Sequence, residues 1–265
     1  MLCRNRGIAT LNDELFILCT PRGGSSFIDV HDLDNLNAGL LKTVIELPEG
    51  RALSMAACPM AMRIYVCIAD HPFNHFSIFS ISKEAEKFQV KRWHDEDATF
   101  AHITVSNRGT VLVLAERLDH YCDILSVYEA DGKLATEIML PCDYCQEVVG
   151  QKLNGHFVLT TYNPLSKRRL LEVDERGSIV FDYHSTIDDT GVVSFADSSD
   201  RILLCDAVGN FEMLDSEFNV MNISVSPGPL RHIYYLYFNR KRGEVMCLSH
   251  NFFDSVLSIF RLKEK

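Results

Sequence analysis

Two segments of the sequence carry side chains that hold metal ions or act as redox groups in proteins. The first contains Cys142 and Cys145, separated by two residues, which is the spacing of half a structural zinc site. No second pair with the required spacing accompanies them, and a redox dithiol of this form would need a strand followed by a helix. We therefore expect a loop with two ordinary thiols.

The second segment runs from His94 through Asp95 and Glu96 to Asp97, with His102 nearby. Carboxylates at alternate positions can serve as oxygen ligands for a divalent cation. The segment lacks the glycine turn of a calcium-binding loop, however. The favoured interpretation is a solvated acidic loop that holds no metal ion.

The rest of the sequence shows no catalytic motif, and its composition narrows the classes of partner. Neither a Ser-His-Asp order nor a phosphate-binding glycine-rich loop is present. Lys and Arg number 26 against 36 Asp and Glu, for a net charge of −10. Proteins that neutralise phosphates need a basic surface, so this balance argues against DNA and disfavours RNA as a partner. Apolar residues at 47% and charged residues at 23% are typical of a globular protein.

The apolar runs and the cysteines indicate a compartment. The uncharged run 52–62 contains Pro59 and is much shorter than the ~20 residues of a membrane span. The first residues are charged and lack the apolar core of a signal peptide. Nine cysteines are an odd number, unlike the even set of a secreted disulfide framework. We expect free thiols, a cytoplasmic location and no association with a membrane.

The elements that position these groups follow from a repeat of short β-rich runs. The last residues of these runs are 19, 67, 114, 160, 205 and 247, so successive runs lie 42 to 48 residues apart. This is the period of β-propeller blades, which have four strands each. Four of the runs end in a cysteine, and we expect these residues in the core; they are Cys19, Cys67, Cys205 and Cys247.

Each repeat contains the parts of one blade. A second strand follows each run, turn residues such as Asp131-Gly132 come next, and a strand of small residues such as 54–57 precedes the run. The prediction is a single all-β domain over 1–265, a six-bladed β-propeller with four-stranded antiparallel blades around a central channel. The blades are expected at approximately 7–47, 53–93, 101–140, 147–183, 191–225 and 231–262. The last repeat lacks a fourth strand, so either 1–6 supply a short closing strand or the ring is sealed imperfectly.

One repeat resembles a known consensus. It contains Ile64-Tyr65-Val66, then Ala69-Asp70, then Asn74-His75 and the run 76–79. This order is similar to the NHL repeat, in which a strand ends in Ala-Asp and an Asn-His pair opens the next strand. The resemblance implies a six-bladed propeller like those of tripartite-motif proteins, with divergent repeats in the rest of the chain.

Two further functions belong to propellers of this kind. NHL propellers can bind single-stranded RNA on a basic face, but the basic clusters 167–169 and 240–242 are expected on opposite faces. Lactonase-like six-bladed hydrolases hold a calcium ion with Glu, Asn and Asp side chains of the inner strands. Too few carboxylates converge on the axis here for such a site, so we expect no enzyme and no cofactor; the inner-strand candidates are Ser54, His102, Thr104, Glu147, Gln151 and Ser194.

The loops of one predicted face hold most of the negative charge and seven of the ten histidines. We therefore predict a non-enzymatic platform for protein–protein interaction, whose partner is a basic or mixed-charge peptide or domain. Single-stranded RNA binding and a metal-dependent lactonase-like hydrolase are the alternatives. The residues expected to contact a partner are Asp70, His71, His75, His94, Asp95, Glu96, Asp97, Asp119, His120, Asp188, Asp189, His232 and His250, together with Lys167, Arg168 and Arg169.

Overall fold

The regular structure of the chain consists almost entirely of β-strands. The computed structural model describes residues 3–21, 25–38, 41–69, 75–85, 87–117, 122–140, 145–163, 166–184, 192–195, 199–206, 209–221, 223–224, 233–239, 241–250, 255–261 and 263–264. In these ranges the one helix is η1, a 3-10 helix at Leu33–Ala38. The expected all-β class is therefore confirmed. None of the described helical residues form a segment with the length and apolar character that crossing a membrane requires.

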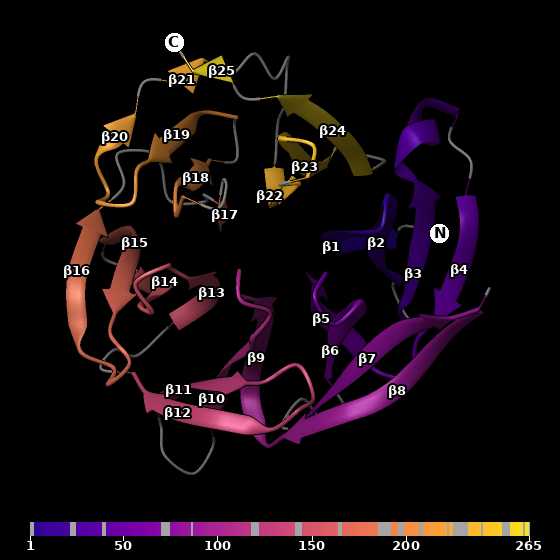
Figure 1. Ribbon diagram of the computed structural model, residues 1–265, viewed down its shortest axis with the longest axis horizontal. Coiled ribbons are helices and arrows are strands. Elements are labelled where there is room, and N and C mark those ends of the chain that lie inside the picture. Colours follow the sequence, from indigo (N-terminus) through magenta and orange to yellow (C-terminus); the bar gives the residue numbers. More distant parts are fainter. Residues whose placement is uncertain are drawn as a thin grey trace. The chain divides into compact units, whose positions relative to one another are not determined.

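The chain divides into two compact units, Met1–Asp143 and Tyr144–Lys265. Three four-stranded antiparallel sheets make up the first unit, coloured indigo to magenta in Figure 1. The first strand of each sheet lies beside the first strand of the next, β1 beside β5 and β5 beside β9. The sheets contain β1 (Cys3–Leu11), β2 (Glu14–Pro21), β3 (Phe27–Asp32) and β4 (Leu41–Glu46); β5 (Arg51–Cys58), β6 (Arg63–Ala69), β7 (Phe76–Glu84) and β8 (Lys87–Glu96); and β9 (Ala98–Val105), β10 (Val111–Arg117), β11 (Cys122–Tyr128) and β12 (Leu134–Met139).

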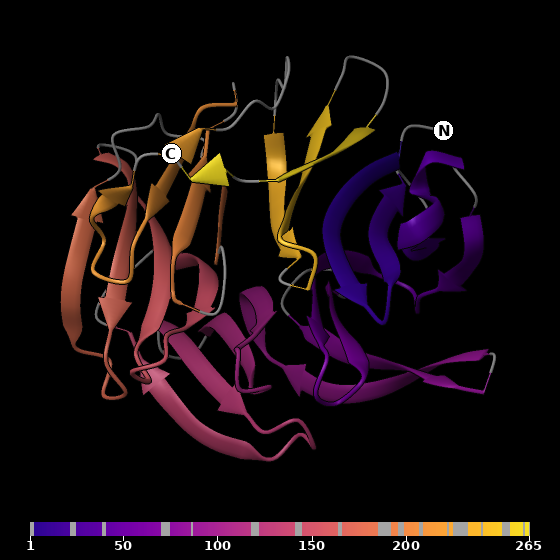
Figure 2. The same ribbon diagram turned by 45° about the horizontal axis from the view of Figure 1, so that its top comes forward.

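The second unit has two four-stranded sheets, one three-stranded sheet and a short strand pair among its described residues (Figure 2). Its first strands also follow one another, β13 beside β17 and β17 beside β22. The elements are β13 (Cys145–Gln151), β14 (Phe157–Asn163), β15 (Ser166–Val173) and β16 (Ile179–His184); β17 (Val192–Phe195), β18 (Ile202–Cys205), β19 (Phe211–Leu214) and β20 (Val220–Met221); β22 (Ile233–Asn239), β23 (Glu244–His250) and β24 (Ser255–Arg261); and the pair β21 (Ile223–Ser224) with β25 (Lys263–Glu264).

The first described residues do not form the separate short closing strand that was one expectation for 1–6. Residues from Cys3 onward belong to β1 and pair with β2, beginning at Cys3↔Pro21. The sheet of β22, β23 and β24 keeps three strands in the described residues. Beyond it, β25 pairs antiparallel with β21, which follows the preceding sheet. The last described residues therefore form a separate two-stranded sheet with β21 rather than a fourth strand beside β24.

The repeated apolar runs form the second strand of each sheet. A strand with neighbours on both sides and packing on both faces reads as a continuous apolar run. All four residues of β18 are buried, and so are nearly all of β2. The run-ending cysteines are buried as predicted, at Cys19, Cys67, Cys205 and Cys247.

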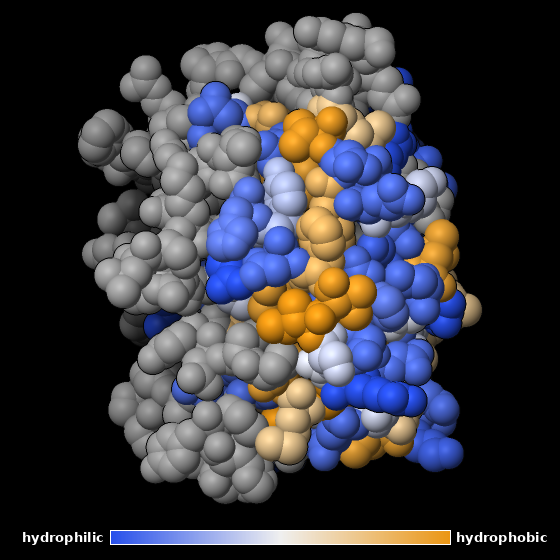
Figure 3. Space-filling model, turned by 90° about the vertical axis from the view of Figure 1, so that its left-hand side faces the viewer, coloured by the Kyte–Doolittle hydropathy of each residue, from blue (hydrophilic) through white to orange (hydrophobic). Residues whose placement is uncertain are grey.

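The fourth strands are the exposed edges of their sheets. Most side chains of β12 and β16 are exposed, and in β16 these include the apolar Ile179, Val180 and Phe181. Figure 3 faces the side of the second unit that carries β16 and β20, and it shows a band of apolar side chains with hydrophilic ones beside it. Of the predicted partner-binding residues in the described ranges, His75 and Asp97 lie in loops at strand ends, and the other seven lie in strands.

Strand order decides which of these loops share one end of a sheet. In antiparallel sheets of order β5-β6-β7-β8, the connection before β7 and the exit from β8 lie at the same end. His75 precedes β7 and Asp97 follows β8, so the sheet brings them together. The expected boundary between the second and third repeats is corrected, because β8 continues to Glu96 and β9 already begins at Ala98.

Candidate partner-binding site

The predicted partner-binding residues divide into three groups. Five have described side chains: His75, His94, Asp95, Asp97 and Arg169. Four lie in described strands, but their side chains are outside the described part: Glu96, Lys167, Arg168 and His250. Seven lie outside the described residues: Asp70, His71, Asp119, His120, Asp188, Asp189 and His232.

His75 connects two of the predicted carboxylates. Its Nδ1 lies 2.7 Å from Oδ1 of Asp97, and its Nε2 lies 3.8 Å from Oδ1 of Asp95. The pairing of β7 with β8, in which Ser77 lies opposite Asp95, produces this proximity. The Asp97 side chain is 85% exposed. The imidazole thus holds a solvent-facing carboxylate at the end of the sheet.

Arg92 adds a positive charge that the sequence analysis did not assign to this site. Its Nε donates to Oδ1 of Asp95 at 2.7 Å, and its Nη2 donates to Oγ of Ser77 at 2.9 Å. The cause is a β-bulge: Ile78 pairs with His94 while Phe79 pairs with Arg92, so Trp93 is the additional residue. The bulge shifts the alternation of side chains by one position. Arg92 and Asp95 therefore lie on the same face of β8.

We name His75, Arg92, Asp95 and Asp97 the acidic cluster. Arg92 offsets one of its two carboxylates, so its formal charge is −1 when His75 is neutral. Histidine is the side chain whose ordinary charge change lies between pH 5 and 8. The acidic cluster therefore presents a formal negative charge to solvent through the exposed Asp97 carboxylate.

His94 does not join the acidic cluster, and the expectation of a solvated acidic loop over 94–97 is wrong for residues 94–96, which lie in a strand. Residues 94–96 are in β8, where adjacent side chains point to opposite faces. His94 Nε2 lies 2.8 Å from the Tyr128 hydroxyl, and the ring centres are 4.7 Å apart. Trp93 packs edge-on against Tyr65 and Tyr128, with ring centres at 5.0 and 5.3 Å. His94 therefore belongs to an aromatic contact between two sheets of the first unit.

Other residues that the sequence analysis considered for binding or metal chemistry have structural roles. Arg169 binds Asp182 through Nε at 3.0 Å and through Nη2, so its charge is offset. Ser54 Oγ accepts a hydrogen bond from the Ile103 amide at 3.0 Å and joins β5 to β9. Cys145 is a buried residue of β13, so the expectation that it lies on a loop is wrong, and Cys142 lies outside the described residues. Within the described ranges, no three His, Cys, Asp or Glu side chains converge as metal ligands would.

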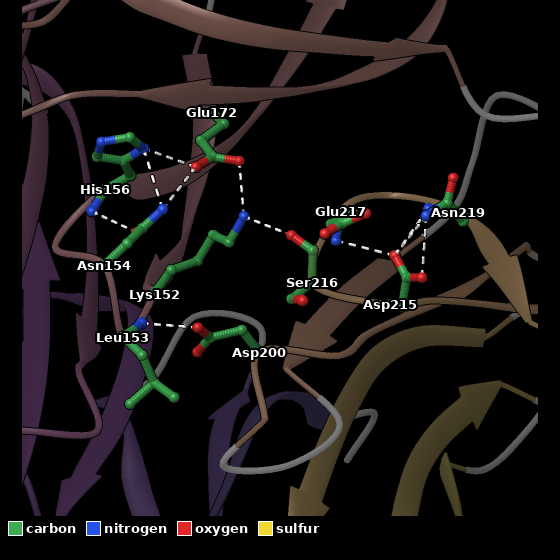
Figure 4. A network of polar contacts seen from close by, with 10 residues as sticks. All are labelled: Lys152, Leu153, Asn154, His156, Glu172, Asp200, Asp215, Ser216, Glu217 and Asn219. Carbon is green, nitrogen blue, oxygen red and sulfur yellow. Dashed lines mark hydrogen bonds and ion pairs between the residues drawn. The ribbon is translucent and has the colours of Figure 1, made fainter.

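A second polar network lies in the second unit and was not predicted (Figure 4). Lys152 Nζ donates to Oε2 of Glu172 at 2.7 Å, and each side chain is 6% exposed. The same ammonium donates to the Ser216 carbonyl at 2.6 Å and lies 5.0 Å from the centre of the Phe218 ring. The contacts join the turn after β13 to the turn between β19 and β20.

The carboxylate of Glu172 has two further partners. Its Oε1 lies 2.7 Å from Nδ1 of His156 and 3.2 Å from Nδ2 of Asn154. Burial alone raises the pKa of this carboxyl, but the hydrogen bonds from its three partners outweigh burial and hold the pKa below its ordinary value. One signal in the sequence could have indicated the pair. Glu172 interrupts an apolar run between Leu171 and Val173, and a charged residue in such a run needs a partner.

Comparison with known proteins identifies the fold. No family model and no curated protein matches the chain. Among solved structures, the chain is similar to the β-propeller domain of the Trilobed protease from Pyrococcus furiosus, described as having an open velcro topology (TM-score 0.58, 12% identity, covering 99% of this chain and 82% of that one). It is also similar to the Kuenenia stuttgartiensis hydrazine synthase (TM-score 0.59, 13% identity, 92% of this chain and 76% of that one). A third similar structure is TolB from Acinetobacter baumannii (TM-score 0.60, 14% identity, 94% of this chain and 60% of that one).

At these identities the likeness concerns the fold alone. The repeat of antiparallel sheets, each with its first strand beside the first strand of the next within a unit, agrees with it. The predicted fold class is confirmed: the chain is a six-bladed β-propeller.

Proposed function

We propose that this propeller is a non-enzymatic platform for protein–protein interaction, and that the acidic cluster binds a basic or mixed-charge peptide. A propeller is compatible with this role, because loops on a rigid scaffold present side chains in fixed positions. We also propose that the repeats are divergent NHL repeats, since His75 stands directly before β7, where the NHL-type Asn-His pair is expected. The proposed location is the cytoplasm, with which the six buried thiols among the described residues are consistent.

The observation that carries the proposal is that two carboxylates are held in place by neighbouring side chains and still exposed to solvent. Asp97 is exposed and held by His75, and Asp95 is held by Arg92 while its side chain stays 42% exposed. Both are therefore oriented before a partner arrives, which lowers the entropic cost of binding a lysine or arginine side chain. Exposed charges of this kind steer association more than they strengthen the final complex. We expect the main effect of the cluster on the association rate.

The test measures association with defined probes. Immobilised chain is exposed to lysine- and arginine-rich nonapeptides and to glutamate-rich counterparts, at about 50 mM and about 300 mM salt. The variant Asp95→Asn/Glu96→Gln/Asp97→Asn removes the negative charge of this segment. Basic peptides should associate more slowly with the variant at low salt, and the difference should diminish at high salt.

A matched control removes the same number of charges elsewhere. Glu129→Gln/Glu175→Gln/Glu217→Gln changes three exposed residues in turns at the opposite ends of their sheets. This control should associate with basic peptides much as the original chain does. Equal slowing by both triple variants would show a general effect of net charge and contradict a site at the acidic cluster.

A further inference from the structure

The sheet of β22, β23 and β24, drawn in yellow tones in Figure 2, ends in an uncovered strand. In the four-stranded sheets the third strand has a neighbour on each side, whereas β24 pairs only with β23 among the described residues. An edge strand presents unpaired backbone N–H and C=O groups on its open side. Its side chains are also open to solvent: Val256 is 38% and Ile259 is 39% exposed. Third strands that a fourth strand covers contain fully buried apolar residues, such as Ile28, Ile78 and Leu125.

The other outer edges are protected against pairing with a further strand. The fourth strands β4, β8, β12 and β16 each shift register by one residue against their third strands, and β20 has only two residues. Bulges and short strands are devices that prevent edge-to-edge pairing. β24 has neither, because its seven residues pair with β23 without interruption. No charged residue, proline or glycine interrupts 255–260, so this edge is open to strand addition.

The sequence of β24 is complementary to an identical strand. A two-fold axis through Ser258 places a second β24 antiparallel beside the first. The opposed residues are then Val256 and Phe260, Leu257 and Ile259, and Ser258 with itself. Pairs of aromatic and β-branched residues directly opposite each other stabilise an antiparallel sheet.

The charges near the strand permit this pairing. Arg261 is the one charged residue of β24 and lies opposite Ser255 in this register, so no like charges face each other. Within one chain, Nη2 of Arg261 lies 3.3 Å from Oε1 of Glu244, which offsets its charge. Each chain carries a net charge of −10, however, and the repulsion between two copies weakens their association unless salt screens it.

From the open edge, its regular pairing and its sequence we propose that two copies of this chain associate through β24. Their three-stranded sheets then form one continuous antiparallel sheet across a two-fold axis. A single strand gives a small interface, so we expect a weak dimer with a dissociation constant of about 0.1 mM. The acidic cluster contributes no residue to this interface, so the dimer and the proposed peptide site are tested separately.

The first experiment measures the oligomeric state of the chain. Analytical ultracentrifugation between about 0.01 and 1 mM should show a monomer–dimer equilibrium that tightens as salt rises from about 50 to 300 mM. Ile259→Lys places an ammonium group on the open edge and should weaken the dimer at least about tenfold. The control Met139→Lys makes the same charge change at a 66% exposed residue of β12 and should leave the equilibrium unchanged. A monomer over the whole range, or equal weakening by both variants, would overturn the proposal.

A second experiment tests the register by cross-linking. Opposed residues of an antiparallel pair have Cα atoms about 4.5–5.5 Å apart, within the range of a disulfide. Oxidation by dissolved oxygen should therefore cross-link Ser258→Cys to its own copy, as seen on a non-reducing gel. Val256→Cys should not cross-link, because four residues, or about 13 Å, separate the two copies of this position. The original chain, oxidised in parallel, corrects for its native thiols. Cross-linking of Val256→Cys but not of Ser258→Cys would refute this pairing, and a dimer that neither variant cross-links would place the interface elsewhere.

Discussion

Lys152 Nζ and Glu172 Oε2 lie 2.7 Å apart, although 20 residues separate them in the chain, and both side chains are almost completely removed from water. Desolvation of two charges is costly, and only a complete set of hydrogen bonds offsets it. The Ser216 carbonyl and the His156 ring complete that set on either side of the pair. The network therefore fixes the distance between turns of two neighbouring sheets in the second unit.

Removal of one residue of this ion pair should destabilise the folded chain, because the other charge stays buried without its counter-charge. In Lys152→Met the Glu172 carboxylate loses its cation, and we expect the free energy of unfolding to fall by about 3–5 kcal/mol. The double variant Lys152→Met/Glu172→Leu should recover most of the loss, because no buried charge remains. Urea denaturation followed by circular dichroism measures both. The exposed pair Lys91–Glu84 provides the control, where Lys91→Met should cost at most about 1 kcal/mol. Equal losses in the two single variants would disprove a special role for the buried pair.

The lowered pKa of Glu172 predicts a dependence of stability on pH. A carboxyl whose pKa is lower in the folded than in the unfolded chain stabilises the fold above its unfolded pKa of about 4.3. That contribution is lost as the pH falls through the lower, folded value. The difference in unfolding free energy between the original chain and Glu172→Gln should thus be constant above about pH 5 and shrink below about pH 4. Parallel stability curves over this range would contradict the assignment.

The buried thiols should be inert in the folded chain. Burial raises the pKa of Cys247 to about 12 and raises that of Cys205 as well, and the thiolate is the reactive form. Six described cysteines are buried thiols, and Cys145 is one of them. With nine cysteines in all, at most three should react quickly with a thiol reagent, and Cys142 is predicted among them. Mass spectrometry after brief labelling identifies the sites; rapid modification of Cys205 or Cys247 would show that their strands open readily.

Arg92 and Asp97 should change partner association in opposite directions. Arg92→Gln frees the Asp95 carboxylate and makes the acidic cluster more negative, so basic peptides should associate faster at low salt. Asp97→Asn removes the exposed charge and should slow association. Rates measured with the same nonapeptides decide between these directions. Slower association with Arg92→Gln would mean that the guanidinium itself contacts the partner.

The propeller could be predicted from local chemistry. A middle strand buried on both faces needs a continuous apolar run, so runs that end at Cys19, Cys67, Cys205 and Cys247 mark a sheet interior wherever they occur. Their period then determines the number of sheets. The proximity of His75 and Asp97 followed from the same strand order, because successive antiparallel strands return to one end of the sheet.

Side-chain contacts between strands and between sheets could not be predicted from the local sequence pattern. The bulge at Trp93 reverses the expected alternation along β8, and it places Arg92 beside Asp95 and His94 against Tyr128. A bulge depends on how neighbouring strands pair, which no local pattern records.

The sequence by itself therefore determined the all-β class, the repeat and the buried cysteines. The tertiary structure alone decided that Arg92 offsets Asp95 and that Lys152 meets Glu172. The physical reason is the separation in sequence between the residues that determine each feature. Burial and alternation depend on the order of neighbouring residues, whereas ion pairs depend on where the packing of separate turns brings distant side chains to rest.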